Sequence, residues 1–317
     1  DDVKASHVDP KVNDEFHQWI QLECGQLKQV AATRGSKHDY LGMTLDYSTK
    51  GEVKVDMRDY VKQMIEDFPQ DLKGKASTPA ADNLFKVDTQ NPLGPSKAEA
   101  FHTQVAKALF LCKRARPDIQ LPVAFLCTRV QNPTKADWSK LKRMMDLLVR
   151  TKEDCLTLRS DGTRTMTWAI DAAFAVHADM RSHTGTSMTL GKGAVYSNSR
   201  KQKLVARSST EAEVVAVDDG MTPLIWTKNF LDAQDYEVKA IILQDNESAI
   251  KLETNGLGSV GQRSRHINIR YFFITDQIRN GTCAIKCCPT DDLEADYHTK
   301  PLQGSKHDKF RTSIMNL

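Results

Sequence analysis

The sequence predicts an α/β protein in which a mixed β-sheet with flanking helices follows a largely helical first half. Two patterns indicate this class. Three short β-forming runs follow one another after residue 164, and from residue 211 onward long apolar segments switch between helical and strand spacing. Composition agrees, because 40% hydrophobic and 27% charged residues are ordinary globular values. With 317 residues, the chain is long enough for two or three domains.

The first elements are a hairpin, a helix and a loop. Residues 37–57 predict two strands, Y-L-G-M-T-L-D-Y and E-V-K-V-D-M, joined by the turn S-T-K-G. A helix is expected over 58–68, ending before Pro69, and its apolar residues lie at helical spacing: Tyr60, Val61, Met64, Ile65 and Phe68. Polar residues with proline and glycine predict a loop over 74–96.

Two or three helices are expected over 97–150. Ser96 is the predicted N-cap of the first, with Glu99 completing a capping box. Asn132-Pro133 interrupts the helical pattern, and either Thr134 or Asp137 opens the last helix. Residues 151–163 then connect to the strand-rich half.

The second half begins with an antiparallel meander. Its three strands are T-R-T-M-T-W-A-I-D, S-M-T-L and A-V-Y-S-N-S, with a turn at Gly191–Gly193. A long helix follows over 211–231, with a kink expected near Pro223. The remaining elements are a buried strand over 240–244, helices over 247–252 and 266–278, a strand over 282–288, and a final helix that starts in the acid-rich segment before residue 300.

Four acidic residues stand out in this half: Asp171, Glu213, Asp245 and Asp296. Asp171 follows the apolar run T-W-A-I, Glu213 opens an apolar helical pattern, and Asp245 ends the run A-I-I-L-Q. Most acids are solvated surface residues, which is the ordinary alternative for each of the four. Together, however, carboxylates that converge from separate elements usually hold divalent metal, as in nucleases that use two Mg²⁺ ions.

Basic residues gather in two clusters although the net charge is only +3. Arg200, Lys201, Lys203 and Arg207 form the first, and Arg263, Arg265, His266 and Arg270 form the second. Such clusters bind phosphates without reading sequence, although a solvated polar face is an equal alternative for any single member. Two clusters beside acid-bearing segments favour a groove for nucleic acid.

Membrane and disulfide chemistry are not expected. No apolar run approaches the ~20 residues of a membrane helix, and no charged-then-apolar leader begins the chain. The seven cysteines are an odd number at irregular spacing, which favours a reducing compartment over a disulfide framework. Cys283, Cys287 and Cys288 cluster, but C-A-I-K-C-C predicts a strand and lacks the paired C-x-x-C of a zinc site.

Residues 160–303 resemble the ribonuclease H domain of copia-type LTR retrotransposons. Five ordered segments carry the resemblance: W-A-I-D-A-A-F-A-V-H-A-D-M-R-S-H-T-G, Y-S-N-S-R-K-Q-K-L-V-A-R-S-S-T-E-A-E, Q-D-N-E-S-A-I, R-H-I-N-I-R-Y-F-F-I and A-D-Y-H-T-K-P-L. Upstream, K-H-D-Y-L-G-M resembles the end of the reverse transcriptase palm, and F-H-T-Q-V-A-K-A-L-F-L-C-K-R-A-R-P-D-I its thumb. The resemblance implies a palm remnant over 1–57, a helical thumb and linking region over 58–155, and a ribonuclease H-like domain over 156–317.

The implied activity is metal-dependent hydrolysis of the RNA strand of RNA–DNA hybrids during retrotransposon reverse transcription. By the resemblance, Asp171 bridges two Mg²⁺ ions (or Mn²⁺), Glu213 and Asp245 hold one, and Asp296 helps to hold the other. Glu211 competes with Glu213 as a ligand, and Glu213 is preferred because an apolar valine run follows it directly.

RNA selection and phosphate binding are expected from other residues. Asn246, Ser209 and Thr210 are candidates to contact a 2′-hydroxyl, which only RNA has. The basic helices of residues 1–150 are expected to grip the hybrid through seven side chains: Lys113, Arg114, Arg116, Lys140, Lys142, Arg143 and Arg150.

Asp1 and Asp2 resemble the Asp pair of the polymerase motif Tyr-x-Asp-Asp. The third polymerase carboxylate and the fingers of that family lie upstream, so this chain alone is not expected to polymerise DNA. The expected partners are the upstream reverse transcriptase portion or other polyprotein products, in cytoplasmic virus-like particles or the nucleus. The alternative is an inactive or domesticated relic that binds nucleic acid or serves a structural role without cutting.

Overall fold

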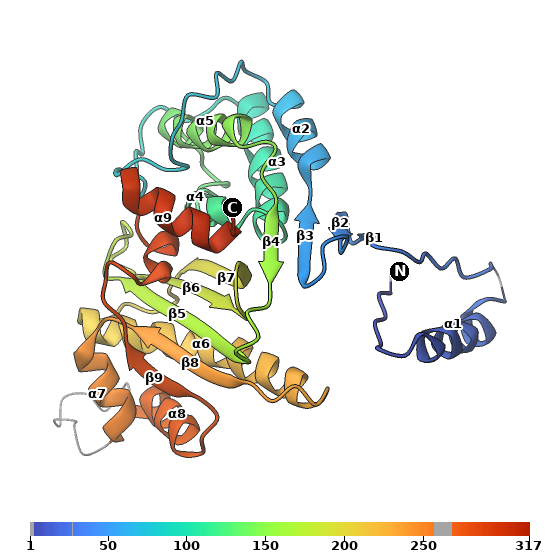
Figure 1. Cartoon of the computed structure of the whole chain (residues 1–317). Helices are drawn as coiled ribbons and strands as arrows, with labels where there is room; N and C mark the ends of the chain where they lie inside the picture. Colours follow the sequence, from blue (N-terminus) through green and yellow to red (C-terminus); the bar gives the residue numbers. More distant parts are fainter. Residues whose placement is uncertain (1–2, 27, 257–267) are drawn as a thin grey trace.

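The computed structural model describes residues 3–26, 28–256 and 268–317, which form two sheets surrounded by helices (Figure 1). The first sheet is antiparallel, in the order β1 (Lys37–Tyr40), β2 (Met43–Asp46), β3 (Glu52–Asp56), β4 (Leu156–Arg159). The second has the order β7 (Ala194–Lys201), β6 (His183–Thr189), β5 (Thr165–Ala173), β8 (Lys239–Gln244), β9 (Ala284–Cys287). Its first three strands are antiparallel, whereas β8 and β9 run parallel to β5. The predicted α/β class, a mixed sheet with flanking helices, is confirmed.

The helices of the first half are α1 (Pro10–Cys24), α2 (Arg58–Glu66), α3 (Pro95–Cys112), α4 (Gln120–Cys127) and α5 (Lys135–Arg150), with a short 3-10 turn, η1 (Pro117–Ile119), before α4. Helices α2 to α5 share one apolar core that includes Phe101, Phe125 and Trp138. Figure 1 shows α1 standing apart from this group, and none of its residues is buried.

The helices of the second half are α6 (Ser209–Asp232), α7 (Glu247–Asn255), α8 (Asn268–Arg279) and α9 (Gly304–Met315), with a 3-10 turn, η4 (Glu294–His298), before α9. Alternate residues of β5 pack under α6: Trp168, Ile170 and Ala172 belong to the same core as the buried face of α6. The other face of β5 therefore carries Asp171, and η4 contacts this strand. Within the described ranges, no helix is long and apolar enough to span a bilayer.

Three sequence expectations differ from the structure in the first half. The run 40–47 is not one strand, because Leu41 and Gly42 both take positive φ and form a two-residue turn between β1 and β2. Ser96 is not an N-cap: α3 begins at Pro95, whose fixed φ suits a first turn, after Gly94. The connection over 151–163 contains β4, which pairs with β3. Thr134, by contrast, does open α5 in a capping box with Asp137.

The end of the chain also differs from the prediction. The acid-rich segment forms η4, a separate turn that ends before Pro301, and α9 begins only at Gly304. The separation follows from Pro301, which has no N–H for helical bonding. The long helix α6 runs unbroken through Pro223. The domain boundaries at 57/58 and 155/156 stay predictions.

Polar contacts buried between the two halves join them. Asp118, after α3, accepts hydrogen bonds from Arg116 at 2.8 Å and from Arg311 of α9 at 2.9 Å, and its side chain is fully buried. Gln120 donates to the carbonyl of Ser197 in β7 at 3.0 Å. The prediction that Arg116 grips a phosphate is therefore wrong, because its guanidinium is buried in this ion pair.

Candidate metal centre

Three of the predicted carboxylates meet at one point. Asp171 lies within β5, Glu213 in the second turn of α6, and Asp245 directly after β8. One side-chain oxygen from each lies within 4.8 Å of the other two. The parallel pairing of β5 with β8 places the ends of these strands side by side, and α6 packs across β5. The three acids thus come together only through the tertiary fold.

Burial and mutual repulsion disfavour the charged forms of two of these acids. Asp171 is 2% exposed and Glu213 is 5% exposed. Burial raises the pKa of Glu213 well above its usual value, and the charges of Asp171 and Asp245 add to the rise. Burial also raises the pKa of Asp171, although Lys300 opposes this shift. A divalent cation bound between the carboxylates would offset both their desolvation and their mutual repulsion.

The fourth acid, Asp296, lies beside this group but outside the set of three. It is buried on η4, and a lysine links it to Asp171: Lys300 Nζ lies 2.5 Å from Asp296 Oδ1 and 3.5 Å from Asp171 Oδ1. Thr299 Oγ1 also donates a hydrogen bond to Asp171 Oδ2. Neither Thr299 nor Lys300 was among the predicted site residues, although both lie in the segment T-K-P-L. Their spacing could have indicated a contact with Asp296, since residues three and four positions after it return to the same side of a helical turn.

Glycine allows η4 to approach the sheet this closely. Gly185 of β6 pairs directly with Asp171. A Cβ at Gly185 would lie 2.6 Å from the Thr299 methyl carbon and 2.9 Å from the carbonyl oxygen of Ala295, too close for any side chain. Ser199 of β7 secures the same turn by donating to the carbonyl of His298 at 2.7 Å. The ring of His298 is fully buried, and burial lowers its pKa to about 3.

The donor set suits a hard divalent cation. All the converging atoms are carboxylate oxygens, which Mg²⁺ and Mn²⁺ prefer over the nitrogen and sulfur ligands of zinc. Asp245 is additionally oriented by Thr290, whose hydroxyl donates to Asp245 Oδ2 at 2.7 Å. The residues present therefore fit a divalent metal ion, which Asp171, Glu213 and Asp245 would hold.

Glu211 and Glu213, the two candidates for one metal ligand, make different contacts in the structure. Glu211 Oε2 accepts a hydrogen bond from the backbone N–H of Arg207 at 2.7 Å, and its own N–H donates to the N-cap Ser208 at 3.1 Å. These contacts stabilise the start of α6. Glu213 instead faces Asp171 and Asp245, and accepts from Gln244 Nε2 at 3.5 Å.

Exchanging each glutamate for glutamine separates the two roles. Glu213→Gln should lower the hybrid cleavage that the family resemblance implies by about a hundredfold or more, since glutamine lacks the negative charge that faces the other two acids. Glu211→Gln should keep most activity and lower stability by about 1 kcal/mol, the usual cost of a weakened cap. Cleavage rates and urea melts of both variants measure this. Greater damage to cleavage from Glu211→Gln would show that the ligand is misassigned.

The predicted phosphate-binding residues fall into two kinds. Arg200 pairs with Asp219 at 2.7 Å, and Lys201 pairs with Asp179 at 2.6 Å, so acids already compensate both. Lys203 and Arg207 lie exposed on the loop that leads into α6, and neither makes an ion pair with any residue that the structure describes. This loop therefore carries two exposed basic side chains shortly before Glu213 in the sequence.

The remaining predictions concern one residue at the site and several outside the described ranges. Asn246 is the N-cap of α7, and its Oδ1 accepts from the N–H of Ala249 at 3.0 Å. The structure does not describe Arg263, Arg265 and His266, nor Asp1 and Asp2.

The sequence is similar to parts of much longer polyproteins. Over 280 residues, or 86% of this chain, the sequence is 28% identical to the retrovirus-related Pol polyprotein from transposon TNT 1-94 of Nicotiana tabacum, of which 21% is covered. Over 202 residues, or 63% of this chain, it is 31% identical to the retrovirus-related Pol polyprotein from transposon RE2 of Arabidopsis thaliana, of which 14% is covered. The chain spans about a fifth of the length of these relatives or less. No family model matches it.

Solved structures resemble the chain more weakly. LC11-RNase H1, isolated from compost by a metagenomic approach, aligns with 42% of this chain and 91% of its own, at 11% identity and a TM-score of 0.30. The foamy viral protease-reverse transcriptase, solved in complex with dsDNA, aligns with 90% of this chain and 52% of its own, at 11% identity and a TM-score of 0.42.

Proposed function

Because the chain belongs to the retrovirus-related Pol polyproteins of copia-like transposons, we propose that its second half hydrolyses the RNA strand of RNA–DNA hybrids. The observation that carries the proposal is the meeting of Asp171, Glu213 and Asp245 within 4.8 Å, from three separate elements. Nothing in the packing of β5, α6 and β8 requires three carboxylates, two of them buried, to face one another, whereas phosphodiester hydrolysis by divalent metal uses such a cluster.

The four acids take distinct positions in this proposal. Asp171, Glu213 and Asp245 would hold one Mg²⁺ or Mn²⁺, and Asp171 with Asp296 would hold the second. When bound, the ions supply an activated water and charge stabilisation for the departing oxygen. Thr299 keeps Asp171 in a fixed orientation by donating to its Oδ2, and Thr290 does the same for Asp245.

Substrate contacts come from the loop and helix start beside the acids. Lys203 and Arg207, exposed before α6, bind phosphates of the hybrid. Asn246 follows Asp245 directly. Because its Oδ1 accepts the hydrogen bond that caps α7, its Nδ2 is the atom that can donate to a 2′-hydroxyl. Ser209 and Thr210, in the first turn of α6, are further candidates for this contact. The activity would serve retrotransposon reverse transcription, together with the other products of the polyprotein.

A labelled RNA–DNA hybrid tests the proposal directly. The purified chain should cut the RNA strand with Mg²⁺ or Mn²⁺, leave duplex DNA intact and lose all cleavage in excess EDTA. Gel analysis of end-labelled strands measures each arm. Cleavage that persists in EDTA would contradict the metal mechanism. Binding of the hybrid without any cleavage in either metal would instead identify an inactive relic that retains the nucleic-acid surface.

A further inference from the structure

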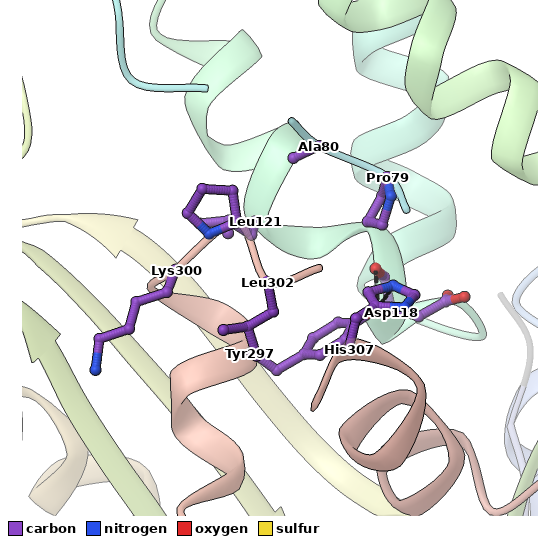
Figure 2. Close-up of a pocket in the computed structure, with 9 residues that line it drawn as sticks. Pro79, Ala80, Asp118, Leu121, Tyr297, Lys300, Leu302 and His307 are labelled. Carbon is purple, nitrogen blue, oxygen red and sulfur yellow. Dashed lines mark hydrogen bonds between the residues drawn. The ribbon is translucent and has the colours of Figure 1, made fainter. Parts of the chain in front are cut away.

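Lys300 places an ammonium group between two buried carboxylates. Its Nζ lies 2.5 Å from Asp296 Oδ1 and 3.5 Å from Asp171 Oδ1, and the side chains of both acids are buried. Figure 2 shows the lysine side chain extending away from Asp118 and His307, so its amine does not join the buried contacts at the joint between the halves. The amine is thus directed to the acids.

The two acids that Lys300 contacts differ from the other two in their partners. Lys306 Nζ lies 3.0 Å from Asp296 Oδ2, so both oxygens of Asp296 face ammonium groups. Glu213 and Asp245, by contrast, accept from the neutral groups of Gln244 and Thr290, and neither has an ion pair within the part of the chain that the structure describes. Positive charge is therefore concentrated on the Asp171–Asp296 side of the site.

We infer that the Lys300 ammonium occupies the cation position between Asp171 and Asp296, so that a second divalent ion must displace it. The inference rests on the proposed two-ion site. Coulomb attraction between unit charges at these distances is several times stronger in a protein site than in bulk water. Lys300 therefore competes with the second ion and leaves the position at Asp171, Glu213 and Asp245 to fill first.

Displacement of the ammonium is feasible from its setting. The Lys300 side chain is 39% exposed, and a long flexible stem carries the charge. Moving it into water opens the space between the two carboxylates without changing η4, whose position is held by Ser199 and by the close packing at Gly185. The inference assigns Lys300 a role in charge compensation, separate from the ligands themselves.

Metal titration without nucleic acid tests this role. Mn²⁺ is titrated into the full chain by calorimetry, with melting temperature followed in parallel. The wild-type chain should bind one ion tightly and a second ion more weakly. In Lys300→Met the Kd of the second ion should fall by roughly tenfold or more, as expected when one competing ammonium is removed. Without metal, the same variant should melt at a lower temperature, because Asp171 and Asp296 lose their shared cation.

Lys309→Met is the matched control. Lys309 lies on α9, which follows Lys300 in the chain, and it contacts Asp292 and the carbonyl of Asp291 but neither Asp171 nor Asp296. It should leave both affinities and the metal-free melting temperature unchanged. Lys300→Arg retains the charge and serves if the methionine variant does not fold, and it should bind the second ion no more tightly than the wild-type chain.

The outcomes separate the inference from the proposed function. An unchanged second-ion affinity in Lys300→Met overturns the inference, as does a tightened second site in Lys300→Arg. Neither result affects the triad of Asp171, Glu213 and Asp245. Failure of the wild-type chain to bind any Mn²⁺ would instead contradict the proposed metal-dependent function.

Discussion

Asp171→Asn should abolish hybrid cleavage while the protein remains folded. Asp171 contributes to both proposed ion positions, so its loss should remove about 4 kcal/mol or more of transition-state stabilisation, or about a thousandfold in rate. Asparagine is nearly the same shape and keeps an oxygen to accept the Thr299 hydrogen bond. Removing one of three clustered negative charges should also leave the metal-free melting temperature equal or higher.

Asp179→Asn is the control for this experiment. Asp179 is a half-exposed acid on the loop that follows β5, and it pairs with Lys201 at 2.6 Å and Arg181 at 3.5 Å, away from the triad. Its variant should cleave hybrids at nearly the wild-type rate. Single-turnover cleavage and thermal melts in EDTA compare the two. A large drop in the melting temperature of Asp171→Asn would mean that the acid serves folding and not metal binding.

Asp118→Ala should cause the largest loss of stability of any single change considered. Asp118 is fully buried and accepts from two guanidiniums, Arg116 at 2.8 Å and Arg311 at 2.9 Å. Alanine would leave both positive charges buried without their shared partner, a loss that costs about 3–5 kcal/mol in comparable cases. Urea denaturation measures the free energy of unfolding. Asp59→Ala is the control, because Asp59 is fully exposed and its pair with Lys62 is at the surface.

Lowering the pH should remove the stabilisation from the Asp118 ion pairs in the wild-type chain. Burial alone would raise the pKa of Asp118, but Arg116 and Arg311 hold it well below its usual range. A carboxylate with a lowered folded-state pKa stabilises the fold above its unfolded pKa of about 3.9, and this stabilisation is lost as pH falls below that value. The unfolding free energy of the wild-type chain should therefore decline more steeply below about pH 4 than that of Asp118→Ala. Parallel slopes for the two proteins would contradict this account.

Local sequence patterns predicted most of the elements. Alternating and helical spacing identified β5, α6 and β8, and each of these carries one acid of the triad. These patterns are sufficient because side-chain periodicity follows directly from the geometry of strands and helices. Two of the failures were at positions where backbone restrictions compete: at Pro95, proline began α3 earlier than the predicted serine cap, and Pro301 separated η4 from α9.

The sequence by itself determined the order of elements in the second half and the four acids that were candidates for the site. Only the tertiary structure decided that Glu213 faces Asp171 while Glu211 caps its helix, that Arg116 is buried against Asp118, and that Lys300 links Asp171 to Asp296. The physical reason is distance along the chain. The charge and burial of a side chain depend on partners that can lie more than a hundred residues away. No local sequence pattern shows which of several neighbouring carboxylates or cations will contact such a partner.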